Sequence, residues 1–140
     1  MILYCDTSAL VKLYISEAHS EQLAGQLEQA ESVAVCRIAW AEAHSAFARR
    51  AREVPVDSET IEHAKAALAA DWPDFVIMEV NQNLVELAGE YADTFALRGY
   101  DSVQLAAAHA LLKITGSTVM FASFDLRLNK AAKALGMLCL

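Results

Sequence analysis

Four acidic residues stand at points in the sequence where a carboxylate is typical of a ligand rather than of a solvated surface: Asp6, Glu42, Asp101 and Asp125. Asp6 follows the apolar run 1–5, which predicts a strand buried on both faces. The other three come shortly after a predicted strand or at the start of a predicted helix. In an open parallel sheet these points meet at one edge, where ligands bind. We therefore expect the four carboxylates to face one crevice.

Carboxylates brought that close repel one another, and unpaired like charges raise each other's pKa. A bound cation removes this conflict. Because the set contains only oxygen donors, and no Cys or His residues at ligand spacing accompany it, the set favours a hard ion such as Mg²⁺ or Mn²⁺. The chemistry that needs this arrangement is metal-assisted attack of water on a phosphodiester.

Each carboxylate also has a purely structural interpretation. Glu42 is compatible with an ordinary exposed helix residue, Asp101 with a helix N-cap, and Asp125 with a cap of the last helix. For Asp6 the capping role is less favoured, because Ser8 is well placed to cap the following helix and an acid at the end of a buried strand is costly. The hypothesis of a metal site rests on the coincidence of all four.

Hydroxyl and basic side chains near the carboxylates are further candidates for the site or its substrate: Thr7, Ser8, Ser123, Arg49, Arg127 and Lys130. The three hydroxyls are placed to orient a carboxylate or hold a metal-bound water, although caps and turns use the same residue types. Arg127 and Lys130 lie one turn past Asp125 and are candidates for holding phosphate, with a solvated helix face as the alternative. Arg49 lies two turns from Glu42 on the same side of its helix, which suits contact with nucleic acid or with an acidic group of a partner.

Apolar periodicity predicts the elements that position these residues. Buried strands are predicted after the first one, with a short edge strand at the end, over 33–36, 74–80, 118–122 and 137–140. Helices are predicted between them, over 8–15, 20–30, 38–52, 58–70, 81–97, 101–113 and 125–135. Gly99 is expected to take the left-handed geometry of a helix C-cap. Strands that alternate with helices predict a three-layer α/β/α domain over 1–140, with a central parallel sheet of four to five strands.

Composition narrows the class of protein. The chain of 140 residues is about one domain in size, and 56% hydrophobic residues with two Pro and five Gly argue against disordered or fibrous classes. No apolar run reaches the length of about 20 residues that a membrane span needs. Three cysteines at unrelated spacing, without a signal-peptide pattern, indicate free thiols in a reducing cytoplasm. We therefore expect a cytoplasmic protein with no membrane contact.

The net charge of the chain limits how it can bind nucleic acid. A net charge of −7 argues against binding through charge alone. The charge is uneven, since residues 1–100 carry seven Lys/Arg against sixteen Asp/Glu, whereas residues 101–140 carry four against two. A locally basic surface in the C-terminal part is compatible with this distribution.

Four segments together resemble a PIN domain, and more narrowly the VapC toxins of toxin–antitoxin pairs: Ile2–Lys12, Ala41–Ala43, Tyr100–Ala106 and Ser123–Asp125. They come in the family's order and span the whole chain. The resemblance implies a Mg²⁺- or Mn²⁺-dependent endoribonuclease whose acidic quartet maps to Asp6, Glu42, Asp101 and Asp125. It also implies tRNA or ribosomal RNA as substrates, a homodimer, and inhibition by a VapB-like antitoxin that presents a basic residue to the acidic pocket. We expect the apolar dimer surface on the helices over residues 20–70.

Two alternatives stand beside this interpretation. A haloacid-dehalogenase-like phosphatase also begins with a strand that ends in Asp and uses Mg²⁺, but that class has a second Asp two positions on, where this chain has Ser8. A non-catalytic PIN-like interaction module would keep the fold and bind a partner without cutting RNA. Loss of metal binding with partner binding retained would favour the module.

Overall fold

The computed structural model describes all 140 residues and contains one five-stranded sheet in which every strand pair is parallel. Its strands are β1 (Ile2–Cys5), β2 (Ser32–Cys36), β3 (Val76–Met78), β4 (Val119–Ala122) and β5 (Leu138–Cys139). Their order across the sheet is β3-β2-β1-β4-β5, so the first strand lies at the centre. The predicted parallel sheet and its short edge strand are confirmed, although β3 is shorter than the pattern over 74–80 predicted.

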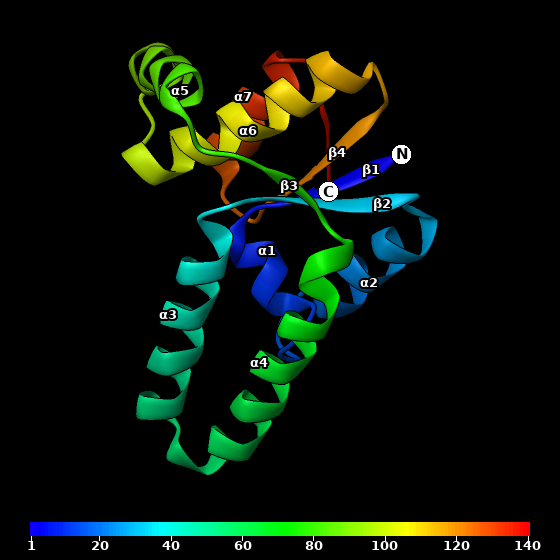
Figure 1. The fold of residues 1–140 in the computed structure, drawn as a ribbon, viewed down its shortest axis with the longest axis vertical. Coiled ribbons are helices and arrows are strands. Elements are labelled where there is room, and N and C mark those ends of the chain that lie inside the picture. The colour runs from blue at the N-terminus through cyan, green and yellow to red at the C-terminus, as the bar shows by residue number, and fades with distance from the viewer.

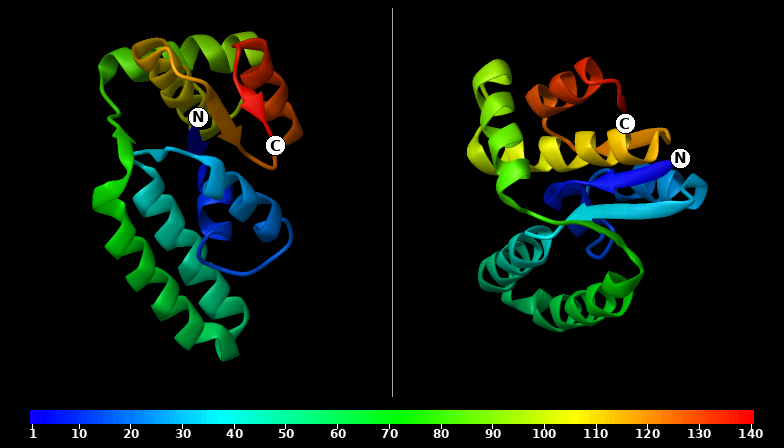
Figure 2. Two further views of the ribbon diagram at one scale, coloured as in Figure 1. Left: turned by 90° about the vertical axis from the view of Figure 1, so that its right-hand side faces the viewer. Right: turned by 45° about the horizontal axis from the view of Figure 1, so that its top comes forward.

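Helices cover both faces of this sheet (Figure 1). One face carries α1 (Thr7–Lys12), α2 (Ser20–Gln29), α3 (Ala39–Glu53) and α4 (Ser58–Asp71), and the other carries α5 (Gln82–Phe95), α6 (Gly99–Thr115) and α7 (Leu126–Ala134). Short 3₁₀ helices lie on either side of α4, at η1 (Pro55–Asp57) and η2 (Trp72–Asp74). The three-layer α/β/α architecture is therefore confirmed. Figure 2 shows α3 and α4 projecting together away from the sheet.

The side chains of strand β1 pack into two hydrophobic core clusters, one on each face of the sheet. These side chains alternate, so Leu3 and Cys5 pack in the cluster that includes α1 and α3, whereas Ile2 and Tyr4 pack in the cluster that includes α6. All four are buried. A strand covered on both faces has no polar side, which is why an unbroken apolar run predicted it. No helix of the chain combines the length and the apolar character needed to cross a membrane.

The strand order reverses at β1. From β1 the chain builds β2 and β3 on one side, and it later returns to build β4 and β5 on the other. In open α/β sheets, ligands bind outside the carboxyl ends of the strands at such a reversal. Asp6 directly follows β1 and Ser123 directly follows β4. The topology therefore brings two of the predicted site residues to the expected edge.

Two predictions about helix ends were wrong. Asp6, rather than Ser8, is the N-cap of α1, because a carboxylate directly after the strand reaches the unpaired amide of Ala9, three residues on. Gly99 does not end α5. Ala96 takes the left-handed conformation there, with φ of 53°, and Gly99 is the first residue of α6.

Candidate active site

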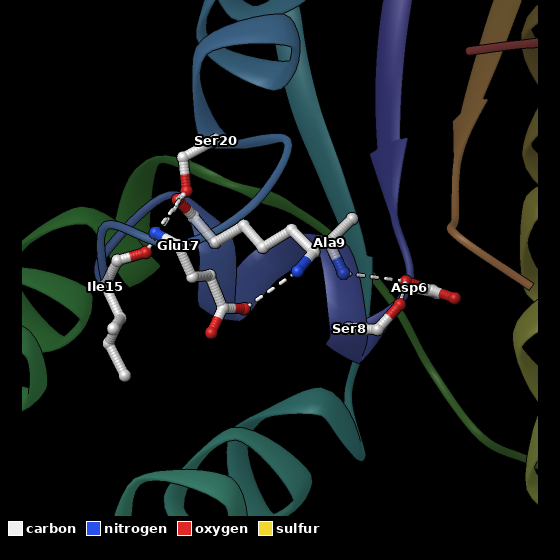
Figure 3. Close-up of polar contacts among 7 residues, drawn as sticks. Asp6, Ser8, Ala9, Ile15, Glu17 and Ser20 are labelled. Carbon is white, nitrogen blue, oxygen red and sulfur yellow. Dashed lines mark hydrogen bonds and ion pairs between the residues drawn. The ribbon is translucent and has the colours of Figure 1, made fainter. Parts of the chain in front are cut away.

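Asp6 is the only buried carboxylate of the chain, with 6% of its surface exposed. Its Oδ1 accepts hydrogen bonds from the Ser8 hydroxyl at 2.7 Å and the Ala9 amide at 2.9 Å, while Oδ2 points away from both donors (Figure 3). Burial raises the pKa of the Asp6 carboxyl above its ordinary value, and the negative charge of Asp101 adds to that rise. Hydrogen bonds from Ser123, Ser8 and Ala9 lower the same pKa. A cation at Oδ2 would relieve the cost of this buried charge.

Glu42 is held by a polar network centred on Gln104. The Thr7 hydroxyl donates to Oε1 of Glu42 at 2.8 Å, and Nε2 of Gln104 donates to the same oxygen at 3.0 Å. Nε2 of Gln104 also lies 3.3 Å from Oγ1 of Thr7. At the other end of the amide, Oε1 of Gln104 accepts a hydrogen bond from the Tyr4 hydroxyl at 2.7 Å. The network fixes Glu42 beside Thr7, the residue that follows Asp6.

Sequence reasoning missed both Gln104 and Tyr4. Gln104 is 3% exposed and lies three residues after Asp101 in α6, so the two side chains leave the same side of that helix. Tyr4 is fully buried on β1 and stacks on Phe121 of β4. The available signal was one amide in the otherwise apolar segment 103–108, because a buried polar side chain requires hydrogen-bond partners.

Asp101 and Asp125 line the same cavity of about 320 Å³. This cavity, here called the acidic cavity after its two carboxylates, is lined by Ala96, Leu97, Arg98, Asp101, Asp125 and Arg127, so two arginines face it as well. Asp101 lies in the first turn of α6, where its Oδ2 is 3.4 Å from Nε of Arg98. Asp125 is the N-cap of α7, and its Oδ1 accepts the Leu128 amide at 2.9 Å. The capping role proposed for Asp125 is thus confirmed, and it coexists with a place in the cavity.

Ser123 connects the two carboxylates that follow the central strands. It is 1% exposed at the end of β4, and its contact with Asp6 lowers the pKa of that carboxyl. Its hydroxyl oxygen also accepts the backbone amide of Asp125 at 3.2 Å. The turn after β4 is therefore tied to the turn after β1.

The three predicted cations lie in different surroundings. Arg127 lines the acidic cavity, and its guanidinium donates to the Ala96 carbonyl at 3.1 Å. Arg49 lies in a second cavity, here called the Glu42 cavity, which is lined by Thr7, Ile38, Ala41, Glu42, Ser45, Ala46, Arg49 and Tyr100. Lys130 is exposed on α7 and lines neither cavity.

The four predicted carboxylates are related pairwise at one edge of the sheet, although no direct hydrogen bond joins any two of them. Asp6 is close enough to Asp101 for their charges to interact, Asp101 shares the acidic cavity with Asp125, and Glu42 is bonded to the neighbour of Asp6. No three His, Cys, Asp or Glu side chains form a preformed metal cluster. The donors still fit Mg²⁺ or Mn²⁺, because they are all oxygen and because Mg²⁺ is commonly held by one or two carboxylates with water completing its shell.

Comparison with known proteins assigns the chain to a family. The sequence matches the PIN domain over residues 3–134. The chain belongs to the PIN-domain family. This PIN domain is 31% identical to Ribonuclease VapC45 of Mycobacterium tuberculosis (strain CDC 1551 / Oshkosh) over 139 residues, which cover 96% of this chain and 92% of that relative. Membership argues against the haloacid-dehalogenase-like alternative.

Solved structures share the fold of this PIN domain. PAE2754 from Pyrobaculum aerophilum matches it with a TM-score of 0.66 at 22% identity, covering 99% of this chain and 83% of that chain. VapBC2 from Rickettsia felis, bound to a DNA fragment from their promoter, matches with a TM-score of 0.64 at 14% identity, covering 100% and 98% respectively. The sheet order and the two helical layers are therefore those of a PIN fold.

Proposed function

We propose that this PIN domain, over residues 1–140, is a Mg²⁺- or Mn²⁺-dependent endoribonuclease and the toxin of a VapBC-like toxin–antitoxin pair. The observation that carries the proposal is that Asp6 is buried and has no cationic partner. It is buried at the carboxyl end of the central strand, close enough to Asp101 for their charges to interact, and none of the ion pairs of the chain involves it. A divalent cation supplies the missing charge. The similarity to Ribonuclease VapC45 supports RNA as the substrate.

The ion would be held by Asp6, Asp101, Glu42 and Asp125. When bound, it supplies charge for the phosphoryl oxygens and makes an attacking water more acidic. The chain's own contribution is orientation. Ser8 and Ala9 hold Oδ1 of Asp6, and Oδ2, which points away from both of these donors, is the oxygen proposed to bind the ion. In the same way Thr7 and Gln104 hold one oxygen of Glu42, which leaves the other available.

The charged and apolar side chains on the surface are the basis for the proposed substrate contacts and partners. Arg127 in the acidic cavity, Arg49 in the Glu42 cavity and Lys130 on α7 are the proposed phosphate contacts for a tRNA or ribosomal RNA substrate. A VapB-like antitoxin is the proposed inhibitor, because Asp101 and Asp125 in the acidic cavity are acceptors for a basic residue of such a partner. A homodimer is proposed through the helices over residues 20–70, where exposed apolar side chains include Trp40 and Val56.

The test is cleavage of total RNA by the purified chain without antitoxin. Reactions contain Mg²⁺, Mn²⁺ or EDTA, and the Asp6→Asn variant is run in parallel. The side-chain oxygen of Asn can accept the hydrogen bond from the Ala9 amide just as that of Asp does, so the variant keeps the helix cap. Asp93→Asn, which removes an exposed carboxylate from α5, is the matched control.

We expect discrete RNA fragments with wild type and with Asp93→Asn. Because even partners that only orient a metal ligand change activity by about 10–100-fold, loss of Asp6 itself is expected to lower the rate by at least about 100-fold. EDTA is expected to abolish the fragments. Full activity of Asp6→Asn, or activity in EDTA, would refute the metal-dependent nuclease. A folded chain that cuts no RNA with either metal would favour the interaction module.

A further inference from the structure

Tyr100 differs from the other three tyrosines of the chain. Each of those pairs its hydroxyl with another side chain: Tyr4 with Gln104, Tyr14 with Asp71 and Tyr91 with His109. Tyr100 is 71% exposed and makes neither a side-chain hydrogen bond nor a ring contact within the chain. Its ring is therefore available to a ligand.

The position of Tyr100 connects it to the candidate active site. It lies in the first turn of α6, directly before Asp101, and it lines the Glu42 cavity. That cavity has a volume of about 530 Å³. Sites for small molecules typically range from about 300 to 1,000 Å³, so the space suits one nucleotide rather than a folded domain.

Arg49 supplies the second uncommitted group of the Glu42 cavity. It is exposed and takes part in no ion pair, in contrast to Arg50, which binds Asp57, and Arg98, which lies beside Asp101. The cavity thus offers an unpaired ring and an unpaired guanidinium close to a carboxylate of the site. A nucleotide has a partner for each, because its base stacks on aromatic rings and its phosphate accepts hydrogen bonds from guanidinium.

The charge of the whole chain makes stacking the more useful contact. A chain with net charge −7 gains little from phosphate contacts alone. Stacking does not depend on net charge, and single-stranded RNA is commonly recognised through bases that leave the stack and lie on aromatic side chains. A basic peptide segment suits the cavity less well, because it would meet Arg49.

We infer that the Glu42 cavity is a subsite for one unpaired nucleotide next to the scissile phosphate, with its base on Tyr100 and its phosphate on Arg49. The inference rests on the proposed function. It adds the side chain that contacts the base, Tyr100, and the side chain that contacts the phosphate, Arg49.

The test measures binding without cleavage. The parent is the full chain carrying Asp6→Asn, and the probe is a fluorescein-labelled single-stranded RNA of roughly ten nucleotides, read by fluorescence anisotropy. Adding Tyr100→Ala is expected to raise Kd by about 5- to 150-fold, the value of one base–aromatic stack. Tyr100→Phe keeps the ring and is expected to stay within about twofold of the parent. Ile114→Ala removes another exposed side chain near the far end of α6 and should leave Kd unchanged.

Two further arms separate stacking from charge and from pairing. Tyr100→Ala should leave the slope of log Kd against log salt unchanged, whereas Arg49→Ala should reduce its magnitude by about 0.7, the value of one phosphate contact to a single strand. Annealing the complementary strand should remove the difference between Tyr100→Ala and its parent, because a paired base stays in its own stack.

Equal affinity of Tyr100→Ala and its parent, with RNA cleavage by the wild type intact, would overturn the subsite and leave the proposed function standing. Unchanged RNA binding together with loss of a co-purifying antitoxin would assign Tyr100 to the protein partner and would also overturn it. Absence of both cleavage by the wild type and binding by the parent would instead refute the proposed function.

Discussion

Asp6 combines two roles that pull its protonation in opposite directions. Its Oδ1 caps α1 through the Ala9 amide, which favours the charged carboxylate. Burial and the nearby charge of Asp101 favour the neutral acid, and the net result is a pKa above the ordinary value of 3.8. The protein without metal therefore keeps a proton at this position more readily than the unfolded chain does.

This difference predicts how stability without metal depends on pH. The folded-state pKa of Asp6 lies above its unfolded value of 3.8, so its contribution to stability is full below pH 3.8 and is lost as pH rises through the raised pKa. Asp6→Asn keeps the cap and cannot titrate. We expect the difference in Tm, wild type minus Asp6→Asn, to fall as pH rises through this window in EDTA.

Binding of a divalent metal ion should restore, at neutral pH, the stability that is lost when Asp6 ionises. Mg²⁺ at a hundredfold excess over its Kd is expected to stabilise the wild type by about 2.7 kcal/mol, because only the folded chain holds the carboxylates together. The same addition should leave Asp6→Asn nearly unchanged. A Tm difference that stays flat with pH, or an equal Mg²⁺ effect on both proteins, would contradict the assignment of the buried charge.

Gln104 is predicted to support both the core and Glu42. Gln104→Met keeps the volume but leaves the buried Tyr4 hydroxyl without its acceptor, which should lower the free energy of unfolding by about 1–3 kcal/mol. RNA cleavage should fall by about 10–100-fold, because Glu42 loses one of the two donors that orient it. Urea unfolding of Gln104→Met, Tyr4→Phe and the double variant forms a cycle. A double variant whose loss equals the sum of the single losses would contradict the Tyr4–Gln104 hydrogen bond.

Among the helices and strands, the sequence predicted those that a local run of apolar residues determines. The run 1–5 predicted a central strand because a strand buried on both faces needs an unbroken apolar sequence. The same reasoning predicted β4, and it therefore placed Asp6 and Asp125 just past strand ends. The alternation of strands with helices was enough to predict the parallel sheet and its two helical layers.

The end of α5 could not be predicted this way, because tertiary packing decides it. Glycine is the usual left-handed residue, so Gly99 was the natural expectation. Ala96 takes that conformation instead, and the next residue, Leu97, packs against the core cluster of α5 and α6 while its amide bonds to the Ala92 carbonyl at 3.2 Å. Those two gains outweigh the cost of about 1–2 kcal/mol for a left-handed alanine.

The Gln104 network was equally beyond a local pattern. Tyr4 and Gln104 are 100 residues apart in the sequence and meet only because β1 lies under α6. The sequence of α6 shows that a polar side chain occurs within an apolar segment, but it does not show which strand residue faces it. The sequence therefore marked the individual carboxylates as candidates, whereas the hydrogen bonds that orient them needed the structure.

On the scale of the whole molecule, five of the eleven Lys and Arg side chains are already paired with acidic neighbours. Ion pairs join the following side chains: Lys12 with Glu17, Arg37 with Glu79, Arg50 with Asp57, Lys65 with Glu62, and Arg98 with Asp101. With a net charge of −7, the surface has no excess of positive charge to hold a polyanion. The proposed phosphate contacts are the three side chains Arg49, Arg127 and Lys130.

Because only these three side chains are proposed to contact phosphate, we expect the affinity for RNA to depend only weakly on salt concentration. Each phosphate contact to a single strand contributes a slope of about 0.7, so log Kd should rise against log salt with a slope of about 2 at most. Anisotropy with the Asp6→Asn chain should then show Kd rising by no more than about 20-fold between roughly 50 and 200 mM salt. Arg52→Ala, an exposed arginine outside both cavities, should leave the slope unchanged. A slope of about 4 or more would require more phosphate contacts than one copy of this chain offers around its site, and it would place basic side chains of a second copy along the RNA path.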